Sequence, residues 1–121
     1  DVIVSILPDT KNTKNFINAN FLKKMKKTSL LINIGRGSAV SELDLINHTV
    51  NNPNFYASLD VFNKEPLEKK HMFWANRNIT ITPHIAAITD HHSSINYLFK
   101  RFMDFKKNKK IKSDVDIKLG Y

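Results

Sequence analysis

The 121-residue sequence predicts an α/β fold built on a parallel sheet. Four short runs rich in β-branched and aromatic residues are separated by segments long enough to hold a helix. One of those segments repeats its apolar residues at helical spacing, and another contains a typical helix N-cap residue. A Pro, Gly or Asp residue stands near the end of each run, where a buried strand would give way to a loop. Strands that alternate with helices form βαβ units, whose strands are parallel and whose crossovers are right-handed.

The first strand is expected over residues 1–7 (DVIVSIL), a β-branched run that ends at Pro8. Residues 8–13 (PDTKNT) are polar and typical of a turn. An amphipathic helix is expected from Asn15, because Lys residues separate apolar residues at helical spacing. The apolar positions of that helix are Phe16, Ile17, Phe21, Leu22 and Met25.

The second strand is expected over residues 30–34 (LLINI) and is stopped by the turn at 35–37 (GRG). Ser41 is a typical N-cap residue, so the next helix should begin there and continue to Val50. The Asn-Asn-Pro-Asn sequence that follows is typical of a turn and separates this helix from the next strand.

The third strand is expected over residues 55–62 (FYASLDVF) and the fourth over residues 78–82 (NITIT), with a loop between them. Pro83 closes the fourth strand. A last helix is expected from about Asp90, followed by a charged tail. The apolar face of that helix comprises Ile95, Leu98, Phe99, Phe102 and Phe105.

The composition excludes several classes of function. The net charge is +8, but only three of the 19 basic residues are Arg, the residue best suited to bidentate base and phosphate contacts, so nucleic-acid binding is not expected. No apolar run approaches the roughly 18 residues that span a bilayer. The absence of cysteine and of a signal sequence favours the cytoplasm. His71, His91 and His92 are expected at the surface, and no metal site is expected.

In a parallel sheet, functional groups lie just beyond the carboxyl ends of the strands. Polar or conformationally special residues stand at each of these positions: Leu7 and Pro8, the turn at 35–37, Asp60, and Pro83 with His84. The sequence therefore predicts a site along one edge of the sheet.

Three segments resemble the carboxyl-terminal part of the D-isomer-specific 2-hydroxyacid dehydrogenases: NIGRGSAVSELDL (33–45), LDVFNKEPL (59–67) and TPHIAA (82–87). The sequence ITPHIAAIT and the ending Gly120-Tyr121 are most similar to the glyoxylate/hydroxypyruvate reductase A branch. The resemblance implies a Rossmann-type fold, namely the second half of a dinucleotide-binding domain plus a carboxyl-terminal helix. It also implies hydride transfer from NADP(H) or NAD(H) to a small 2-oxo acid, in an enzyme that is a homodimer when intact.

The resemblance further implies roles for individual residues. Arg36 corresponds to the residue that grips the substrate, Glu65 to the acidic partner of the catalytic histidine, and His84 to the general acid. Residues that match cofactor-contacting positions of the family are Leu7, Pro8, Thr13, Ile34, Gly35, Arg36, Asp60, His84 and Ala86, with Asp60 near the carboxamide.

The chemistry requires these residue types independently of the family. A 2-oxo acid carries a carboxylate beside a carbonyl, and the guanidinium of Arg36 can bind both bidentately. Histidine changes its protonation near neutral pH, so His84 is suited to protonate the carbonyl oxygen, and Glu65 beside it favours the charged ring. Taken singly, each residue has a structural explanation: Arg36 as a surface ion-pair residue, Glu65 as a solvated loop residue and His84 as a turn residue. Their occurrence in three motifs at one edge of the sheet favours catalysis.

The main departure from the family is the lack of a G-x-G-x-x-G motif, since the sequence has only three glycines. Residues 1–121 are therefore expected to be a partial NAD(P)-binding domain with a carboxyl-terminal helix and tail, lacking the glycine-rich loop and the substrate domain. The residue that discriminates NAD from NADP would lie in the missing part. Two alternatives stay open: an inactive remnant or split-gene fragment, and a corepressor-like regulatory protein that uses the dehydrogenase fold.

Overall fold

The computed structural model describes residues 1–109, 115–116 and 118–119; the Gly120-Tyr121 ending lies outside the described residues. The chain divides into two compact units, Asp1–Ala86 and Ala87–Tyr121. The first unit contains the sheet and every residue predicted to belong to the site.

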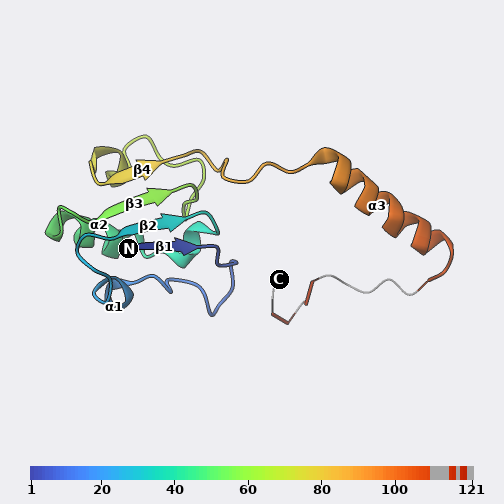
Figure 1. Cartoon of the computed structure of the whole chain (residues 1–121), viewed down its shortest axis with the longest axis horizontal. Helices are drawn as coiled ribbons and strands as arrows, with labels where there is room; N and C mark the ends of the chain where they lie inside the picture. Colours follow the sequence, from blue (N-terminus) through green and yellow to red (C-terminus); the bar gives the residue numbers. More distant parts are fainter. Residues whose placement is uncertain (110–114, 117, 120–121) are drawn as a thin grey trace. The chain divides into compact units, whose positions relative to one another are not determined.

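The first unit is built on a four-stranded parallel sheet in the order β1-β2-β3-β4, which confirms the predicted fold class (Figure 1). Each strand is shorter than its predicted run, because the chain leaves the hydrogen-bonded ladder at the carboxyl end and enters the loops that carry the site. The register aligns Ile3, Leu31, Ala57 and Ile79 across the sheet. The strands are β1 (Val2–Ser5), β2 (Leu30–Asn33), β3 (Tyr56–Leu59) and β4 (Ile79–Ile81).

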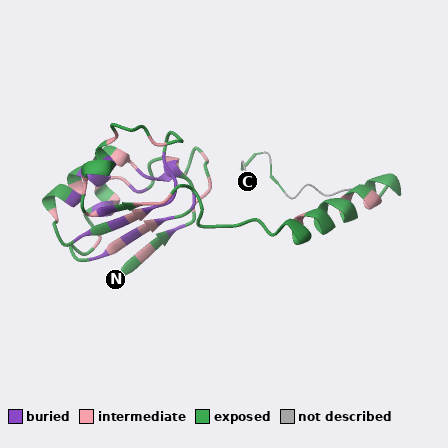
Figure 2. Ribbon diagram, turned by 90° about the horizontal axis from the view of Figure 1, so that it is seen from above, coloured by how far each residue is buried: buried purple, intermediate pink, exposed green. Residues whose placement is uncertain are grey.

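Helices cover one face of this sheet (Figure 2). The longest in the unit is α2 (Glu42–Asn51), which begins after Ser41 as predicted, although the Ser41 side chain makes no capping hydrogen bond. The short helix α1 (Ala19–Leu22) is tied to α2, because the amide of Ala19 donates to the Asp44 carboxylate at 2.9 Å. Two single-turn 3₁₀ helices, η1 (Gly37–Ala39) and η2 (Met72–Ala75), complete the unit.

The prediction of a helix from Asn15 is wrong about where that helix begins. Asn15 has φ 52°, and its amide donates to the carbonyl of Ser38. Ile17 forms a parallel bridge with Val40. This backbone pairing ties Asn15 and Ile17 to the segment at 38–41 and keeps them out of the helix. The helix begins only after Asn18, whose side-chain oxygen accepts the amides of residues 20 and 21 as an N-cap.

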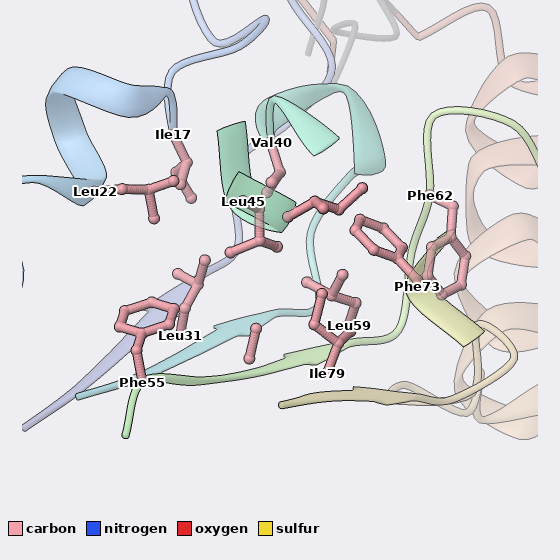
Figure 3. Close-up of a cluster of buried hydrophobic side chains, with 12 residues drawn as sticks. Ile17, Leu22, Leu31, Val40, Leu45, Phe55, Leu59, Phe62, Phe73 and Ile79 are labelled. Atoms are coloured by element: carbon pink, nitrogen blue, oxygen red, sulfur yellow. The ribbon is translucent and has the colours of Figure 1, made fainter. Parts of the chain in front are cut away.

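A single apolar core fills the space between the helices and the covered face of the sheet (Figure 3). Its largest fully buried side chains, Phe55 and Phe73, are no more than 1% exposed. Burying each such ring stabilises the fold by about 1.5–3 kcal/mol. The core comprises Ile17, Leu22, Leu31, Val40, Leu45, Ile46, Phe55, Ala57, Leu59, Phe62, Phe73 and Ile79.

The second unit contains α3 (His91–Lys106), which begins after Asp90 as predicted. The Asp90 carboxylate accepts the amide of Ser93 at 2.9 Å, a typical N-cap hydrogen bond. Within the second unit taken by itself, no residue of α3 is buried, including the apolar face predicted from the sequence. Among the described residues, no helix is long and apolar enough to cross a membrane.

Candidate active site

His84 and Glu65 form a hydrogen-bonded pair beyond the carboxyl ends of β3 and β4. The Nδ1 atom of His84 lies 2.8 Å from Oε2 of Glu65, and the two side chains are 52% and 36% exposed. The other carboxylate oxygen of Glu65 accepts the amide of Phe62 at 2.9 Å. The hydrogen bond from His84 and then that from Phe62 outweigh partial burial and lower the pKa of Glu65. An ionised carboxylate only accepts hydrogen bonds, so Nδ1 of His84 carries a proton and Nε2 is left for other chemistry.

The turn that carries His84 is fastened to Asp60. His84 has φ 55°, a left-handed conformation that costs roughly 1–2 kcal/mol in a residue other than glycine. Its amide donates to the carbonyl of Asp60 at 2.9 Å. The Asp60 carboxylate accepts the hydroxyl of Thr82 and the amides of Ile85 and Ala86, each amide at 2.9 Å. Bonds on both sides of His84 therefore fix its backbone.

Asp60 is 3% exposed, so its carboxylate is committed to this turn. Burial raises the pKa of Asp60, but the hydrogen bonds from Thr82, Ile85 and Ala86 outweigh it and the net pKa is lowered. The sequence predicted that Asp60 lies near a cofactor carboxamide. The structure assigns its oxygens to the His84 turn, and contact with a cofactor stays a prediction.

We expect Asp60→Asn to destabilise the first unit by about 1–3 kcal/mol, because the amide group leaves at least one buried donor unsatisfied. The folded-state pKa of Asp60 lies below its ordinary value of 3.8. The stability that its charge provides is therefore present above pH 3.8 and is lost as pH falls through the lowered value. Urea unfolding at several pH values should show a cost that shrinks in acid. A cost independent of pH would show that the charge of Asp60 does not stabilise the turn.

The turn at 35–37 presents Arg36, and Asn33 holds its backbone. Asn33 is fully buried at the end of β2; its Nδ2 donates to the carbonyl of Arg36 at 3.0 Å, and its Oδ1 accepts the amide of Gly35 at 3.3 Å. The Arg36 side chain is attached to the rest of the turn by a hydrogen bond from Nη1 to the carbonyl of Gly35 at 2.8 Å. Arg36 as a whole is exposed, so its guanidinium is accessible to a ligand.

Both glycines of this turn are required by neighbouring backbone. A Cβ atom on Gly35 would lie 2.6 Å from the amide nitrogen of Leu7, and one on Gly37 would lie 2.0 Å from the carbonyl carbon of Phe62. Distances under 3.0 Å do not occur for real Cβ atoms. The turn that carries Arg36 therefore packs directly on the chain that leads to Glu65.

The remaining predicted cofactor-contacting residues lie in the same unit. Leu7 and Pro8 follow β1 and are half-buried, and the Thr13 hydroxyl donates to the carbonyl of Pro8 at 2.6 Å, which closes that loop. Ile34 at the end of β2 is 41% exposed, and Ala86 beyond β4 is exposed. Backbone and side chains at the carboxyl ends of the strands thus remain open to a ligand.

A cavity of about 490 Å³ lies beside the Glu65–His84 pair. Its walls are largely apolar, and they come from the loop after β3, the helix η2 and the end of β4. The lining residues are Phe62, Glu65, Pro66, Leu67, Trp74, Ile81, Pro83 and His84.

Sequence analysis missed several residues that support the site. Asn33 holds the turn at 35–37, and Thr82 helps to hold the turn that carries His84. The available signal for both was their position, as polar residues at the end of a buried strand. His71 was expected at the surface and is partly exposed there. Its side chain is 23% exposed, and its Nε2 atom lies 3.4 Å from a carboxylate oxygen of Glu42.

Comparison with known proteins supports the resemblance found in the sequence. Residues 1–86 match the family described as D-isomer specific 2-hydroxyacid dehydrogenase, NAD binding domain. A curated glyoxylate/hydroxypyruvate reductase A from Photorhabdus laumondii is 39% identical over 120 residues, which are 99% of this chain. The chain spans only 38% of the length of that relative.

Solved structures give the same result. An NADPH-dependent glyoxylate/hydroxypyruvate reductase from Sinorhizobium meliloti, in complex with NADP and sulfate, superposes with a TM-score of 0.88 at 31% identity, covering 100% of this chain and 40% of that one. A D-isomer specific 2-hydroxyacid dehydrogenase from Xanthobacter autotrophicus, in complex with NADPH and MES, gives 0.86 at 29% identity, covering 95% and 48%.

Proposed function

Because the chain belongs to the D-isomer specific 2-hydroxyacid dehydrogenase family, NAD binding domain, we propose that it supplies the catalytic groups of a reductase that acts on small 2-oxo acids. The proposed catalytic residues are Arg36, Glu65 and His84. The observation that carries the proposal is the 2.8 Å pair between His84 and Glu65, on loops that follow adjacent parallel strands. Glyoxylate and hydroxypyruvate are the proposed substrates, as the names of the similar reductases suggest.

In this proposal, His84 is the acid that protonates the substrate carbonyl oxygen. Its Nδ1 proton is directed at Glu65, so Nε2 is the atom that delivers a proton. The lowered pKa of Glu65 keeps that carboxylate ionised, so it accepts the Nδ1 proton of His84 and holds the orientation of the ring. The hydrogen bonds that Asp60 accepts from the amides of His84, Ile85 and Ala86 fix the backbone that carries the ring. This fixed geometry reduces the entropic cost of reaching the transition state.

Arg36 is the proposed anchor for the substrate carboxylate. Its backbone is held by buried Asn33, while its guanidinium is exposed and carries further donors besides the one bound to Gly35. A planar guanidinium matches a carboxylate in two parallel hydrogen bonds, which fixes the orientation of the adjacent carbonyl.

The proposed cofactor is NADPH or NADH, which supplies the hydride when bound. The residues that would lie along its nicotinamide half are at the open carboxyl ends of the strands, where parallel sheets bind such ligands. They are Leu7, Pro8, Thr13, Ile34, Gly35, Arg36, Asp60, His84 and Ala86. A cytoplasmic location and a homodimeric assembly of the intact enzyme also stay predictions.

A chimera tests the proposal directly. Residues 1–121 would replace the matching segment of the Photorhabdus reductase, so that the relative supplies the remainder of the enzyme. Once circular dichroism shows that the chimera is folded, it should oxidise NADPH or NADH in the presence of glyoxylate or hydroxypyruvate. The Arg36→Ala/His84→Ala double variant is the inactive control. A folded chimera no more active than this control would contradict the proposal.

We expect the 121-residue chain by itself to bind NADPH and NADH weakly. The pyrophosphate of a dinucleotide binds at a glycine-rich loop and helix N-terminus, and this sequence contains no G-x-G-x-x-G. Titration followed by cofactor fluorescence should show no saturable binding in the micromolar range. A clear micromolar affinity would mean that the carboxyl ends of these four strands suffice for binding.

A further inference from the structure

Glu42, the first residue of α2, reaches away from its own helix to the loop that follows β3. Its Oε1 accepts the amide of Asn63 at 3.0 Å, and its Oε2 lies 3.4 Å from Nε2 of His71. The Glu42 and His71 side chains are only 22% and 23% exposed. One carboxylate therefore holds two points of the loop, eight positions apart, against the start of α2.

His71 is itself fixed to the core. Its Nδ1 accepts the amide of Phe73 at 3.3 Å, and its ring packs edge-on against the Phe73 ring at 4.5 Å between centroids. Phe73 is 1% exposed. Because Nδ1 accepts a hydrogen bond, Nε2 is the ring nitrogen that faces Glu42.

The segment held by Glu42 and His71 is the one that presents Glu65. Two consecutive amides divide between two carboxylates: Phe62 donates to Glu65 at 2.9 Å, and Asn63 donates to Glu42 at 3.0 Å. The Asn63 side chain also donates to the carbonyl of Val40 at 3.3 Å. A displacement of Asn63 would therefore move the amide that orients Glu65.

We propose that Glu42, together with His71, is a positioning residue for the Glu65–His84 pair. Glu42 touches neither member of the pair and acts through the backbone of Phe62 and Asn63. The catalytic importance of this arrangement rests on the proposed function. The arrangement itself does not depend on the proposed function, so signals that require no enzymatic activity can test it.

The experiment is NMR spectroscopy of the full chain, with Glu42→Ala, Glu42→Gln and Glu68→Ala variants. Two signals report on the pair: hydrogen exchange at the Phe62 amide, and the imidazole ¹⁵N shifts of His84, which identify the protonated nitrogen. Glu68 is the matched control, because its exposed carboxylate lies on the same segment and pairs with Lys64 at 2.7 Å without reaching α2.

Glu42→Ala should accelerate exchange at the Phe62 and Asn63 amides by about tenfold or more, since a hydrogen bond to a charged group contributes about 1.5–3 kcal/mol. The same variant should shift His84 away from the Nδ1-protonated form. Glu42→Gln should restore much of both signals, because its amide oxygen can still accept from Asn63. Glu68→Ala should leave both unchanged.

Faster exchange confined to α2 in Glu42→Ala, with unchanged signals at Phe62 and His84, would overturn the proposal and leave Glu42 a helix-start residue. Equal losses in Glu42→Ala and Glu68→Ala would overturn it as well. If Glu42→Ala does not fold, His71→Phe keeps an aromatic ring against Phe73 but removes both the contact with Glu42 and the acceptor for the Phe73 amide. Unchanged signals at Phe62 and His84 in that variant would equally overturn the proposal. An inactive chimera would contradict only the proposed function.

Discussion

His84→Ala in the chimera should lower the turnover of glyoxylate and hydroxypyruvate by about 10²–10⁴-fold, the usual contribution of a general acid. Alanine removes the ring whose Nδ1 is bound to Glu65, so no side chain remains there to protonate the carbonyl oxygen. The affinity for NADPH or NADH should change little, because the turn keeps its shape without the ring. Its hydrogen bonds run from backbone amides to Asp60 and do not involve the His84 side chain. Steady-state kinetics and a fluorescence titration measure the two quantities separately.

His92→Ala is the matched control for this prediction. His92 is exposed near the start of α3, and it belongs to a different unit of the chain from the proposed site. The control should keep the activity of the chimera within about twofold, as is usual for the substitution of an exposed residue. Near-normal turnover in His84→Ala would assign protonation of the substrate to another group.

The fold was predictable because its signals are local. Each strand lies within a short, largely apolar run, and α2 follows a typical capping residue, so local sequence patterns located both. The start of α1 was not predictable in this way. Residues 15–17 carry helical spacing, but the amides of Asn15 and Ile17 donate to the carbonyls of Ser38 and Ala39, about 23 residues later in the chain. Tertiary hydrogen bonds overrode local propensity there.

The site was only partly accessible from the sequence. Motifs identified Glu65 and His84, and topology places both beyond the carboxyl ends of neighbouring strands, where the structure gives a 2.8 Å contact. Their catalytic roles stay predictions. The supporting contacts of Asn33 and Glu42 were not visible, because a polar side chain gives no sequence signal of which backbone amides it will meet. The contacts of His71 were not visible for the same reason.

Gly37 is the residue at which the smallest substitution should have the largest structural effect. In Gly37→Ala, the new Cβ would lie 2.0 Å from the carbonyl carbon of Phe62, 2.1 Å from its oxygen and 2.5 Å from its Cα. All three atoms are backbone, so no side-chain rotation relieves the clash. The turn carrying Arg36 and the loop carrying Glu65 must move apart instead, which increases the distance between two parts of the proposed site.

We therefore expect Gly37→Ala to destabilise the chain by at least the roughly 1–3 kcal/mol typical of overpacking, and to lower the activity of the chimera even where it remains folded. Ser38→Ala is the matched control, because it alters the next residue of the same turn and removes only an exposed hydrogen bond to Asp9. Urea unfolding measures the change in stability. Turnover without denaturant, at a temperature well below the unfolding transition, measures the change in activity. Equal stability and activity in the two variants would show that Phe62 can move away from the turn without a cost in free energy. Close packing of these two segments would then not be what holds Arg36 and Glu65 at the same edge of the sheet.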